Sequence, residues 1–479
     1  MSRLLRRLLT PRLLAAALLI AAPALAYDPT WASLNTRPLP PWYDESKVGI
    51  FIVGGVFSVP SWGTESGGAS GEWFEQEWLG SDGKRGNPAY AEFMSQRYPP
   101  SFTYGDFAPG LTMDLFNATQ WAELFVASGA KYTVYLTKHH DGFTLWPSPT
   151  SPNWNSVDVG PHRDITGEIS AAAKAAGLHS GLYHSLFEWF NPLYLADKAA
   201  NWTTTTFVPK AMGELVDLVN KYEPELIWSD GDWEAPDSYW DAPKNFLAWL
   251  VNESPVKDTV VFNDRWGDGD SCHVGSYYTC SDRYNPGHKT NHKWEDAMTL
   301  DRHSWGFRRN ARAATDYLSF AELMQQLTST VACGGNLLVN VGPALDGTIN
   351  TLMEERLLQM GAWLRVNGPA IYATVPWRAQ KEGNASSPDV WYTAASAAPG
   401  ADAFALLLRW PPGGLLNLTV PVAGAAMRAT LLTAGGGLPA AVAGTPGAAG
   451  VRLQLPAYAP DLAGTGTDVA WAVRLEGVT

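Results

Sequence analysis

The pattern of apolar and polar positions changes once along this chain. From about residue 27 to residue 376, short apolar runs rich in β-branched and aromatic residues alternate with longer stretches in which apolar residues recur every three to four positions. The first pattern is typical of buried strands and the second of amphipathic helices. The expected strands cover residues 48–57, 132–138, 180–184, 226–229, 260–263, 336–341 and 370–374.

The helical stretches lie between these strands. Repeated strand–helix units predict an α/β fold with a parallel sheet, and over a region of this length we expect a (β/α)8-like TIM barrel. A doubly wound open sheet is the alternative, although no Gly-x-Gly-x-x-Gly turn opens a helix here. The expected helices cover residues 115–128, 164–176, 208–222, 320–331 and 352–366.

After Trp377 the helical periodicity disappears, charged residues become fewer, and Gly and Pro increase. Short apolar runs separated by turn residues predict a C-terminal β-sandwich, so we expect the barrel over residues 27–376 and the sandwich over 377–479. The Ala- and Gly-rich stretch 433–450 is predicted to be a mobile surface loop. The expected strands cover residues 390–393, 403–408, 416–420, 429–432, 451–455 and 469–475.

Composition narrows the classes of protein and partner. Hydrophobic residues make up 46% and charged residues 17% of the chain, which excludes a disordered chain, a collagen and a coiled coil. The formal net charge of −13 disfavours binding to phosphate backbones, so we expect no nucleic-acid partner. There are 22 Trp residues, and we expect about two thirds in the core and the others to be free to stack on a ligand.

The first 26 residues predict a cleaved signal peptide. A basic start is followed by an apolar stretch over residues 13–20 and by the small-x-small site Ala24-Leu25-Ala26. The apolar stretch is too short to span a bilayer comfortably, and no later stretch is apolar enough for a membrane helix. We therefore expect a soluble protein of the secretory route without membrane insertion. Sequons at Asn117, Asn201, Asn252, Asn384 and Asn417 agree with this route.

Three cysteines are present. Cys272 and Cys280 are close enough in sequence to clip one loop, whereas Cys333 lies in an apolar run and is expected to be a buried free thiol. Because no Cys-x-x-Cys pair occurs, we expect no structural zinc site.

Polar clusters follow four of the expected strands. They cover residues 138–142, 183–185, 229–233 and 263–266, and each places Trp, Tyr or His close to other polar groups. Turn chemistry would explain one such cluster. Because the carboxyl ends of barrel strands meet on one face, four clusters in succession predict a single active site.

The mixture of aromatic, imidazole and carboxylate groups suits a neutral polyhydroxyl ligand such as a sugar. Hydrolysis of a glycosidic bond needs two carboxyl groups, and several are available here. A metal site is the competing hypothesis. His139 and His140 are adjacent, so on a strand they would point in opposite directions, which does not suit two ligands of one ion. We therefore expect neither a metal nor a cofactor.

The chain resembles the retaining α-L-fucosidases of glycoside hydrolase family 29, in particular the secreted or lysosomal animal type. The motifs that carry this resemblance occur in the family's order through nearly the whole mature chain. They cover residues 41–44, 97–100, 137–143, 146–149, 159–164, 181–185, 226–231, 263–267, 304–306 and 335–343.

The resemblance implies a fold, an activity and a location. The family's fold is a (β/α)8-like barrel followed by a β-sandwich. Its members remove terminal α-L-fucose from the glycans of glycoproteins or glycolipids through a covalent fucosyl-enzyme, without a cofactor. An extracellular or lysosomal location follows from the same resemblance, and so does a homo-oligomer, because relatives are often oligomeric.

The resemblance also implies roles for single residues. Asp230 matches the nucleophile, and both Asp282 and Glu295 match positions proposed for the acid/base. Asp282 is favoured because a loop clipped by Cys272 and Cys280 would hold it near the site. The positions that match sugar-contacting residues are His139, His140, Tyr183, Arg265, Trp305 and the pair Glu72-Trp73, and Trp228 is a further candidate for an aromatic wall.

Two departures from the family pattern lie on one side of the expected pocket. The first strand typically reads Phe-Ile-His-Trp-Gly in the family, whereas Val53 and Gly54 occupy the His and Trp positions here. A longer connection before Glu72 lets Glu65 compete with it for the alignment, and Glu72 is preferred because Trp73 follows it. These changes leave two alternatives to an active fucosidase, a catalytically impaired fucose-binding relative and a hydrolase of another sugar.

Overall fold

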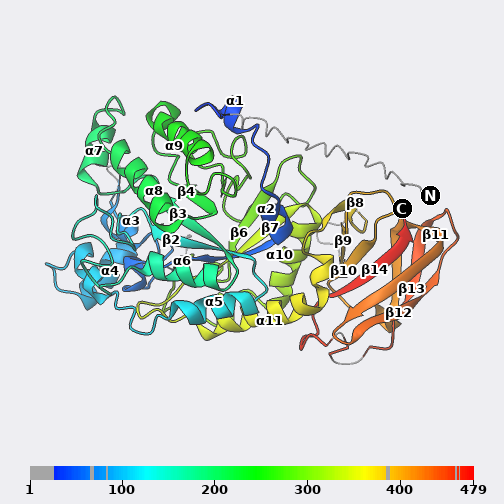
Figure 1. Cartoon of the computed structure of the whole chain (residues 1–479). Coiled ribbons are helices and arrows are strands. Elements are labelled where there is room, and N and C mark those ends of the chain that lie inside the picture. Colours follow the sequence, from blue (N-terminus) through cyan, green and yellow to red (C-terminus); the bar gives the residue numbers. More distant parts are fainter. Residues whose placement is uncertain (1–25, 65–69, 82–84, 384–388, 459–460, 463) are drawn as a thin grey trace, which may run out of the picture.

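The computed structural model describes residues 26–64, 70–81, 85–383, 389–458, 461–462 and 464–479. A body of helices around a sheet comes first, and a body made of strands follows it at the C-terminal end (Figure 1). The predicted signal peptide lies outside the described residues except for Ala26.

A parallel sheet forms the centre of the first body. Its strands run in the order β5-β4-β3-β2-β1-β7-β6, so that β1 lies between β2 and β7. The strands are β1 (Val48–Ile52), β2 (Tyr132–Lys138), β3 (His179–Ser185), β4 (Leu226–Asp230), β5 (Val261–Phe262), β6 (Trp294–Thr299) and β7 (Gly335–Val341).

An irregular segment closes this sheet into a barrel. Ser276 donates its N–H to the carbonyl of Phe262 in β5 at 2.9 Å. On the other side, Tyr278 donates to the carbonyl of Lys293 at 2.9 Å and accepts from the N–H of Glu295 in β6 at 2.8 Å. Residues 276–278 therefore take the place of a strand between β5 and β6, and the predicted barrel is confirmed.

Helices surround the barrel because one face of each is apolar. In α8, for example, Val208, Ala211, Leu215 and Leu218 are buried at helical spacing. The helices are α1 (Trp31–Leu34), α2 (Pro41–Ser46), α3 (Phe74–Leu79), α4 (Pro88–Arg97), α5 (Ala118–Ala127), α6 (Ile165–Ala175), α7 (Pro192–Ala199), α8 (Val208–Tyr222), α9 (Asp241–Asn252), α10 (Phe320–Ala332) and α11 (Thr351–Asn367). Short 3-10 helices are η1 (Val56–Ser58), η2 (Tyr104–Gly110), η3 (Asp237–Trp240), η4 (Gly368–Ala370) and η5 (Pro412–Gly414).

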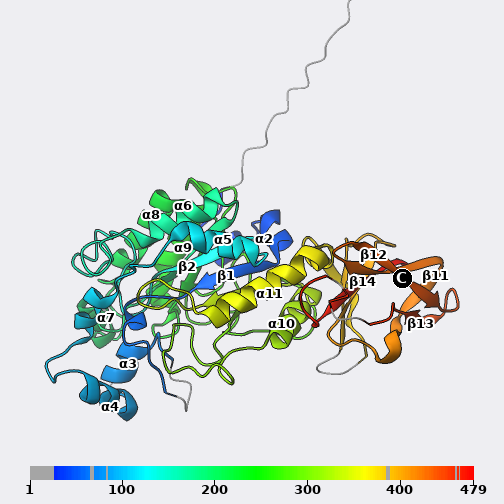
Figure 2. The same cartoon turned by 90° about the horizontal axis from the view of Figure 1, so that it is seen from below.

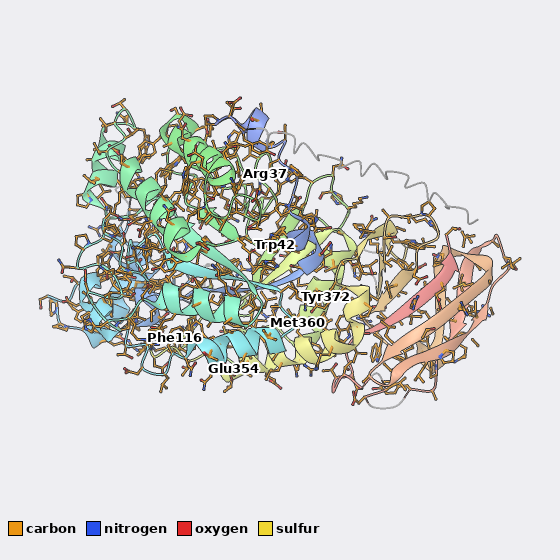
Figure 3. The ribbon with its side chains drawn as sticks, in the orientation of Figure 1. Arg37, Trp42, Phe116, Glu354, Met360 and Tyr372 are labelled. Carbon is orange, nitrogen blue, oxygen red and sulfur yellow. A yellow bond between two sulfur atoms is a disulfide. The ribbon has the colours of Figure 1, made fainter. Side chains whose placement is uncertain are left out.

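The segment before β1 is tied to the barrel near the start of β5. Arg37 and Trp42 of this segment are labelled in Figure 3. Arg37 donates to the carbonyls of Val260 and Lys257 at 2.6 and 2.9 Å, and Trp42 donates to that of Thr259 at 2.8 Å. These contacts fasten the described N-terminal residues to the end of the barrel opposite to the carboxyl ends of the strands.

The C-terminal body is antiparallel, with the strand order β12-β13-β11-β14-β10-β9-β8. The long strand β11 pairs with β13 through its first half and with β14 and β12 through its second half, so it is shared by two layers, as a sandwich requires. The strands are β8 (Val375–Lys381), β9 (Val390–Ala394), β10 (Ala403–Leu407), β11 (Leu415–Thr433), β12 (Gly436–Ala443), β13 (Ala449–Gln454) and β14 (Trp471–Val478).

One apolar core joins the two bodies. Helices α10 and α11 lie between the barrel and the C-terminal strands (Figures 1 and 2). Trp391, Phe404 and Leu406 from the C-terminal strands belong to the same buried cluster as the barrel core. The indole of Trp363 in α11 donates to the carbonyl of Ala470 at 3.0 Å.

Expectations about several single elements differ from the structure. Residues 370–374 form no strand, because η4 and a turn lead there into β8. The stretch 433–450 contains strand β12, which pairs with β11 and β13, instead of a loop throughout. Strand β6 was not expected, because Glu295 and Asp296 interrupt its apolar pattern. Within the described residues, no helix is long and apolar enough to cross a bilayer.

Candidate active site

Side chains from the carboxyl ends of the barrel strands converge on one cavity of about 140 Å³. That volume is below the roughly 300–1,000 Å³ of pockets for drug-sized ligands and suits a single small sugar. Its lining comprises Phe51, Val53, Glu72, Trp73, Leu136, His139, Tyr183, Trp228, Asp230, Trp233, Arg265, Asp282 and Trp305.

Asp230 is the last residue of β4 and lies at the centre of this arrangement. Its Oδ2 accepts a hydrogen bond of 2.8 Å from the hydroxyl of Tyr183 in β3 and lies 3.5 Å from Nε2 of His140. Its Oδ1 accepts from Arg265 Nη1 at 3.0 Å. The carboxylate is 13% exposed, so it is held by three side chains and still reaches the cavity.

The surroundings keep Asp230 ionised. Burial alone would raise the pKa of its carboxyl group, but the hydrogen bond from His140, the charge of Arg265 and the hydrogen bond from Tyr183 outweigh burial. The pKa of Asp230 is therefore well below its ordinary value. A buried carboxylate that stays charged and faces a cavity has the properties of a nucleophile or an electrostatic stabiliser.

Arg265 connects Asp230 to a second carboxylate. Its Nη2 donates to Asp282 Oδ1 at 2.8 Å while Nη1 contacts Asp230. Asp282 is 45% exposed and lines the cavity. It follows a loop closed by the disulfide between Cys272 and Cys280. The structure thus brings Asp230, Asp282 and Arg265 together. The third cysteine, Cys333, is a buried free thiol, as expected.

Glu295 lies elsewhere in the barrel. Its Oε2 accepts from the hydroxyls of Tyr43 and Tyr132 at 2.8 and 2.7 Å, and its Oε1 accepts from the indole of Trp228 at 3.0 Å. Burial raises the pKa of Glu295 to about 7 in spite of these donors. Its side chain is not among those that line the cavity.

Aromatic rings form one wall of the cavity. The rings of Tyr183 and Trp228 stack with centroids 5.5 Å apart, and Phe51 contacts both Trp228 and Trp305. The guanidinium of Arg265 lies 4.7 Å from the Trp228 ring centroid, where the π face is negative. This wall offers an apolar face next to the charged groups.

Val53 lines the cavity, whereas the space beside Gly54 is filled. A Cβ atom at Gly54 would lie 2.6 Å from Cγ of Pro343, closer than real Cβ contacts come. The absence of a side chain at Gly54 therefore leaves no void, because Pro343 occupies that place.

Glu72 reaches the cavity from the segment before α3. Its Oε2 accepts from the Ser304 hydroxyl at 2.8 Å and from the N–H groups of Trp305 and Gly306 at 3.1 and 2.9 Å. Burial raises the pKa of Glu72, although these hydrogen bonds oppose the effect. The competing residue Glu65 lies outside the described residues.

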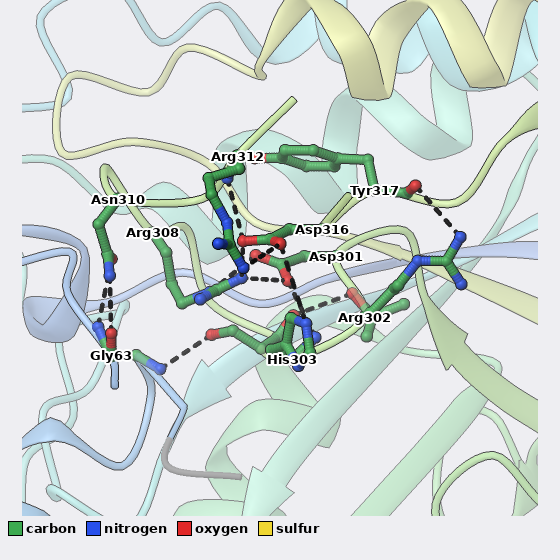
Figure 4. A network of polar contacts seen from close by, with 12 residues as sticks. Gly63, Asp301, Arg302, His303, Arg308, Asn310, Arg312, Asp316 and Tyr317 are labelled. Atoms are coloured by element: carbon green, nitrogen blue, oxygen red, sulfur yellow. Dashed lines mark hydrogen bonds and ion pairs between the residues drawn. The ribbon is translucent and has the colours of Figure 1, made fainter. Parts of the chain in front are cut away.

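A buried ion network holds the loop that carries Trp305. Arg308 donates to both oxygens of Asp301, at 2.9 and 2.7 Å, and lies 3.4 Å from Asp316 (Figure 4). Asn310 in the same loop donates to the carbonyl of Gly63 at 2.8 Å. The loop after β6 and the segment before Glu72 are thereby fastened together.

The two histidines have different positions. His139 directly follows β2 and lines the cavity, and its Nδ1 has no hydrogen-bond partner in the described part of the chain. His140 stacks on Phe187 and contacts Asp230 from outside the cavity lining. The expectation that the two rings point in opposite directions is wrong, because β2 ends at Lys138 and the ring centroids of His139 and His140 lie 4.5 Å apart. Across the described ranges, no group of three His, Cys, Asp or Glu residues could hold a metal ion.

Sequence reasoning missed several members of the site. Phe51 and Leu136 were placed in expected strands without a role at the site, and Trp233, which is 45% exposed and belongs to the polar cluster 229–233, was given no role of its own. The available signals were sequence distances: Phe51 lies two residues before Val53, Leu136 lies two before Lys138, and Trp233 lies three after Asp230. Asp264 belongs to the polar cluster 263–266 but was given no role of its own, and Thr279 gave no such signal, because its contacts join distant turns.

Comparisons with a family model and with known proteins all match alpha-L-fucosidases. The family model described as Alpha-L-fucosidase matches residues 14–369. The chain is 52% identical to the alpha-L-fucosidase of Branchiostoma floridae, over 94% of this chain and 96% of that protein. It is 49% identical to the tissue alpha-L-fucosidase of Homo sapiens, over 96% of this chain and 93% of that protein.

The fold also matches that of a solved alpha-fucosidase structure. The crystal structure of Thermotoga maritima alpha-fucosidase in complex with fucose matches with a TM-score of 0.77 and 30% identity, over 94% of this chain and 100% of that chain. The matches extend over both the barrel and the C-terminal strands. The chain therefore belongs to the α-L-fucosidase family of glycoside hydrolases.

Proposed function

We propose that this α-L-fucosidase removes terminal α-L-fucose from glycans by double displacement, with Asp230 as nucleophile and Asp282 as acid/base. In the first step an oxygen of Asp230 attacks the anomeric carbon, the glycosidic bond breaks, and Asp282 gives its proton to the leaving oxygen. In the second step Asp282 takes a proton from water, the water oxygen attacks the anomeric carbon, and the Asp230 carboxylate leaves.

The observation that carries this proposal is the guanidinium of Arg265, which contacts both Asp230 and Asp282 at the cavity. Asp230 has the lowered pKa that a nucleophile needs. Asp282 is favoured over Glu295 because it lines the cavity and is solvent-accessible, whereas both oxygens of Glu295 are already bonded to buried donors.

Sugar binding is assigned to the remaining lining groups. The free Nδ1 of His139 and the carboxylate of Glu72 can bond hydroxyls, and Trp228 and Trp305 offer apolar faces. The 6-methyl group of fucose would suit the apolar part of the cavity. His140 and Tyr183 are proposed to act on Asp230, which both contact.

The remainder of the glycan has a place beside the cavity. A second cavity of about 560 Å³ shares Trp73 and Trp233 with the first, and these two rings are stacked within 19° of parallel. Gln76, Asn87 and Glu234 add polar groups to its lining. Trp233→Ala should lower kcat/KM for a fucosylated oligosaccharide about fivefold more than for an aryl fucoside, because a stacking surface is lost.

The decisive experiment is release of fucose from an aryl α-L-fucoside by the purified protein, with an active relative as positive control. Asp230→Ala should abolish release while circular dichroism stays unchanged, and azide should restore turnover with formation of a fucosyl azide of inverted configuration. Release of β-L-fucose as first product by NMR would contradict retention. Fucose binding by calorimetry without any release would support the impaired relative instead.

The secretory location and the assembly remain predictions. Relatives named tissue and plasma alpha-L-fucosidase agree with a lysosomal or secreted protein, and fractionation of expressing cells would test this. Sedimentation would test the homo-oligomer that the resemblance implies.

A further inference from the structure

The hydroxyl of Thr279 lies between the arginine of the site and a buried aspartate. Its Oγ1 accepts a hydrogen bond from Arg265 Nε at 3.0 Å and donates one to Asp264 Oδ1 at 2.6 Å. Thr279 and Asp264 are both fully buried. Neither lines the cavity, and the side chain of Thr279 contacts the site through Arg265.

Asp264 fixes the segment that carries this hydroxyl. Besides the hydroxyl, its Oδ1 accepts from the N–H of Thr279 at 2.9 Å. Its Oδ2 accepts from the N–H groups of Cys272 and Cys280 at 2.7 and 3.0 Å, and the disulfide between these cysteines closes the same loop. These contacts fix the position of the Thr279 hydroxyl, which accepts the hydrogen bond from Arg265 Nε.

The three nitrogens of Arg265 have three separate partners. Nε contacts Thr279, Nη1 contacts Asp230, and Nη2 contacts Asp282. Because a guanidinium is planar and rigid, fixing Nε also fixes the directions of the other two nitrogens. Asp230 has further partners, but Asp282 is half exposed, so its position depends more strongly on the guanidinium.

We propose that Thr279 is a positioning residue, whose hydroxyl orients Arg265 and thereby holds Asp282 where it can protonate the leaving group. This inference rests on the proposed function, since it takes Asp282 as the proton donor. It predicts a specific defect. Without the hydroxyl, substrates whose leaving group needs a proton should lose more rate than substrates whose leaving group does not.

Aryl α-L-fucosides test this directly. The series runs from 2,4-dinitrophenyl, an acidic leaving group that departs without protonation, to phenyl, which needs the proton. Thr279→Val should lower kcat/KM for the phenyl fucoside at least about tenfold more than for the dinitrophenyl fucoside. Thr279→Ser retains the hydroxyl and should restore the leaving-group dependence of the native enzyme.

A matched control exists on α10. The hydroxyl of Thr330 also bridges a donor and a buried aspartate, because it accepts from Asn285 at 3.2 Å and donates to Asp296 at 3.0 Å. Thr330→Val removes a comparable pair of hydrogen bonds away from the cavity and should leave the leaving-group dependence unchanged.

Two results would overturn the inference: an equal loss across all leaving groups for Thr279→Val, or the same steepening for Thr330→Val. If Thr279→Val does not fold, Thr279→Ala carries the same expectation with less steric demand. Asp282→Asn, measured on the same series, tests the assignment of Asp282 as proton donor separately from the positioning role of Thr279. Without steepening in Asp282→Asn, the acid assignment itself fails, whatever the Thr279 variants show.

Discussion

The indole N–H of Trp228 donates a 3.0 Å hydrogen bond to Glu295 Oε1, while the ring of Trp228 lines the cavity next to Asp230. Tyr43 and Tyr132 donate to the other oxygen of the same carboxylate. Glu295 therefore supports the aromatic wall from outside the cavity. The sequence offers both Asp282 and Glu295 as the acid/base, and of these two only Asp282 lines the cavity.

Glu295→Ala should destabilise the protein without altering the chemistry of proton donation. Three buried donors would lose their acceptor, at about 1–3 kcal/mol each, so a loss of about 3 kcal/mol or more in the free energy of unfolding is expected. Urea denaturation measures this loss, and the aryl fucoside series measures the chemistry. A steeper leaving-group dependence, as expected for Asp282→Asn, would contradict the structural role.

The stability of the protein should depend on the ionisation of Glu295. Burial raises the pKa of Glu295 to about 7, above the value of about 4.3 for an unfolded chain. Between these values the folded state keeps a proton that the unfolded state has released, so stability is highest below the unfolded pKa and falls as pH rises towards 7. The contribution is about 4 kcal/mol at most.

Glu295→Gln removes this titration and should flatten the decline of Tm with rising pH. Asp232 and Asp296, whose pKa values burial raises to about 7, act in the same direction, so the comparison must be between variant and native protein. Asp230 does not interfere, because its lowered pKa confines its contribution to more acidic pH. Parallel Tm curves for the two proteins would refute the prediction.

Gly54→Ala should be destabilising by about 1–3 kcal/mol, because the new methyl group would collide with the ring of Pro343. Gly213 in α8 provides the control. A Cβ atom there meets nothing within 4 Å, so Gly213→Ala should stabilise the helix by about 0.5–1 kcal/mol. Thermal unfolding of both variants compares the filled space beside Gly54 with the open space beside Gly213. Equal shifts in Tm would show that Pro343 moves aside for the new methyl group.

Loss of the Cys272–Cys280 disulfide should reduce both stability and activity. The bridge closes a loop of sequence separation 8, for which chain entropy predicts about 2.5 kcal/mol. Activity should fall as well, since both N–H groups that bond Asp264 Oδ2 belong to the bridged cysteines. A double Ser variant at these positions tests both effects, with Cys333→Ala as the variant that leaves the bridge intact. Unchanged kcat in the double variant would show that Asp264 alone holds the loop.

Much of the fold could be predicted from single stretches of the sequence. Helix α8 and strand β2 have the bounds expected from their patterns, because each carries one uninterrupted periodicity. Strand β6 escaped prediction because Glu295 looks unsuited to a buried strand until Tyr43, Tyr132 and Trp228 are placed around it. Strand β12 escaped because its Ala- and Gly-rich sequence carries little signal, and pairing with β11 and β13 supplies what is missing.

The sequence by itself determined the barrel, the strand ends that line the cavity, and the family, because periodicity and ordered motifs are properties of the chain alone. Only the tertiary structure decided which carboxylate shares Arg265 with Asp230, what fills the space beside Gly54, and that Thr279 lies behind the guanidinium. The physical reason is that these relationships are distances between segments far apart in the chain. Such distances are set by how the strands, the disulfide loop and the loop after β6 pack together, and no local pattern records them.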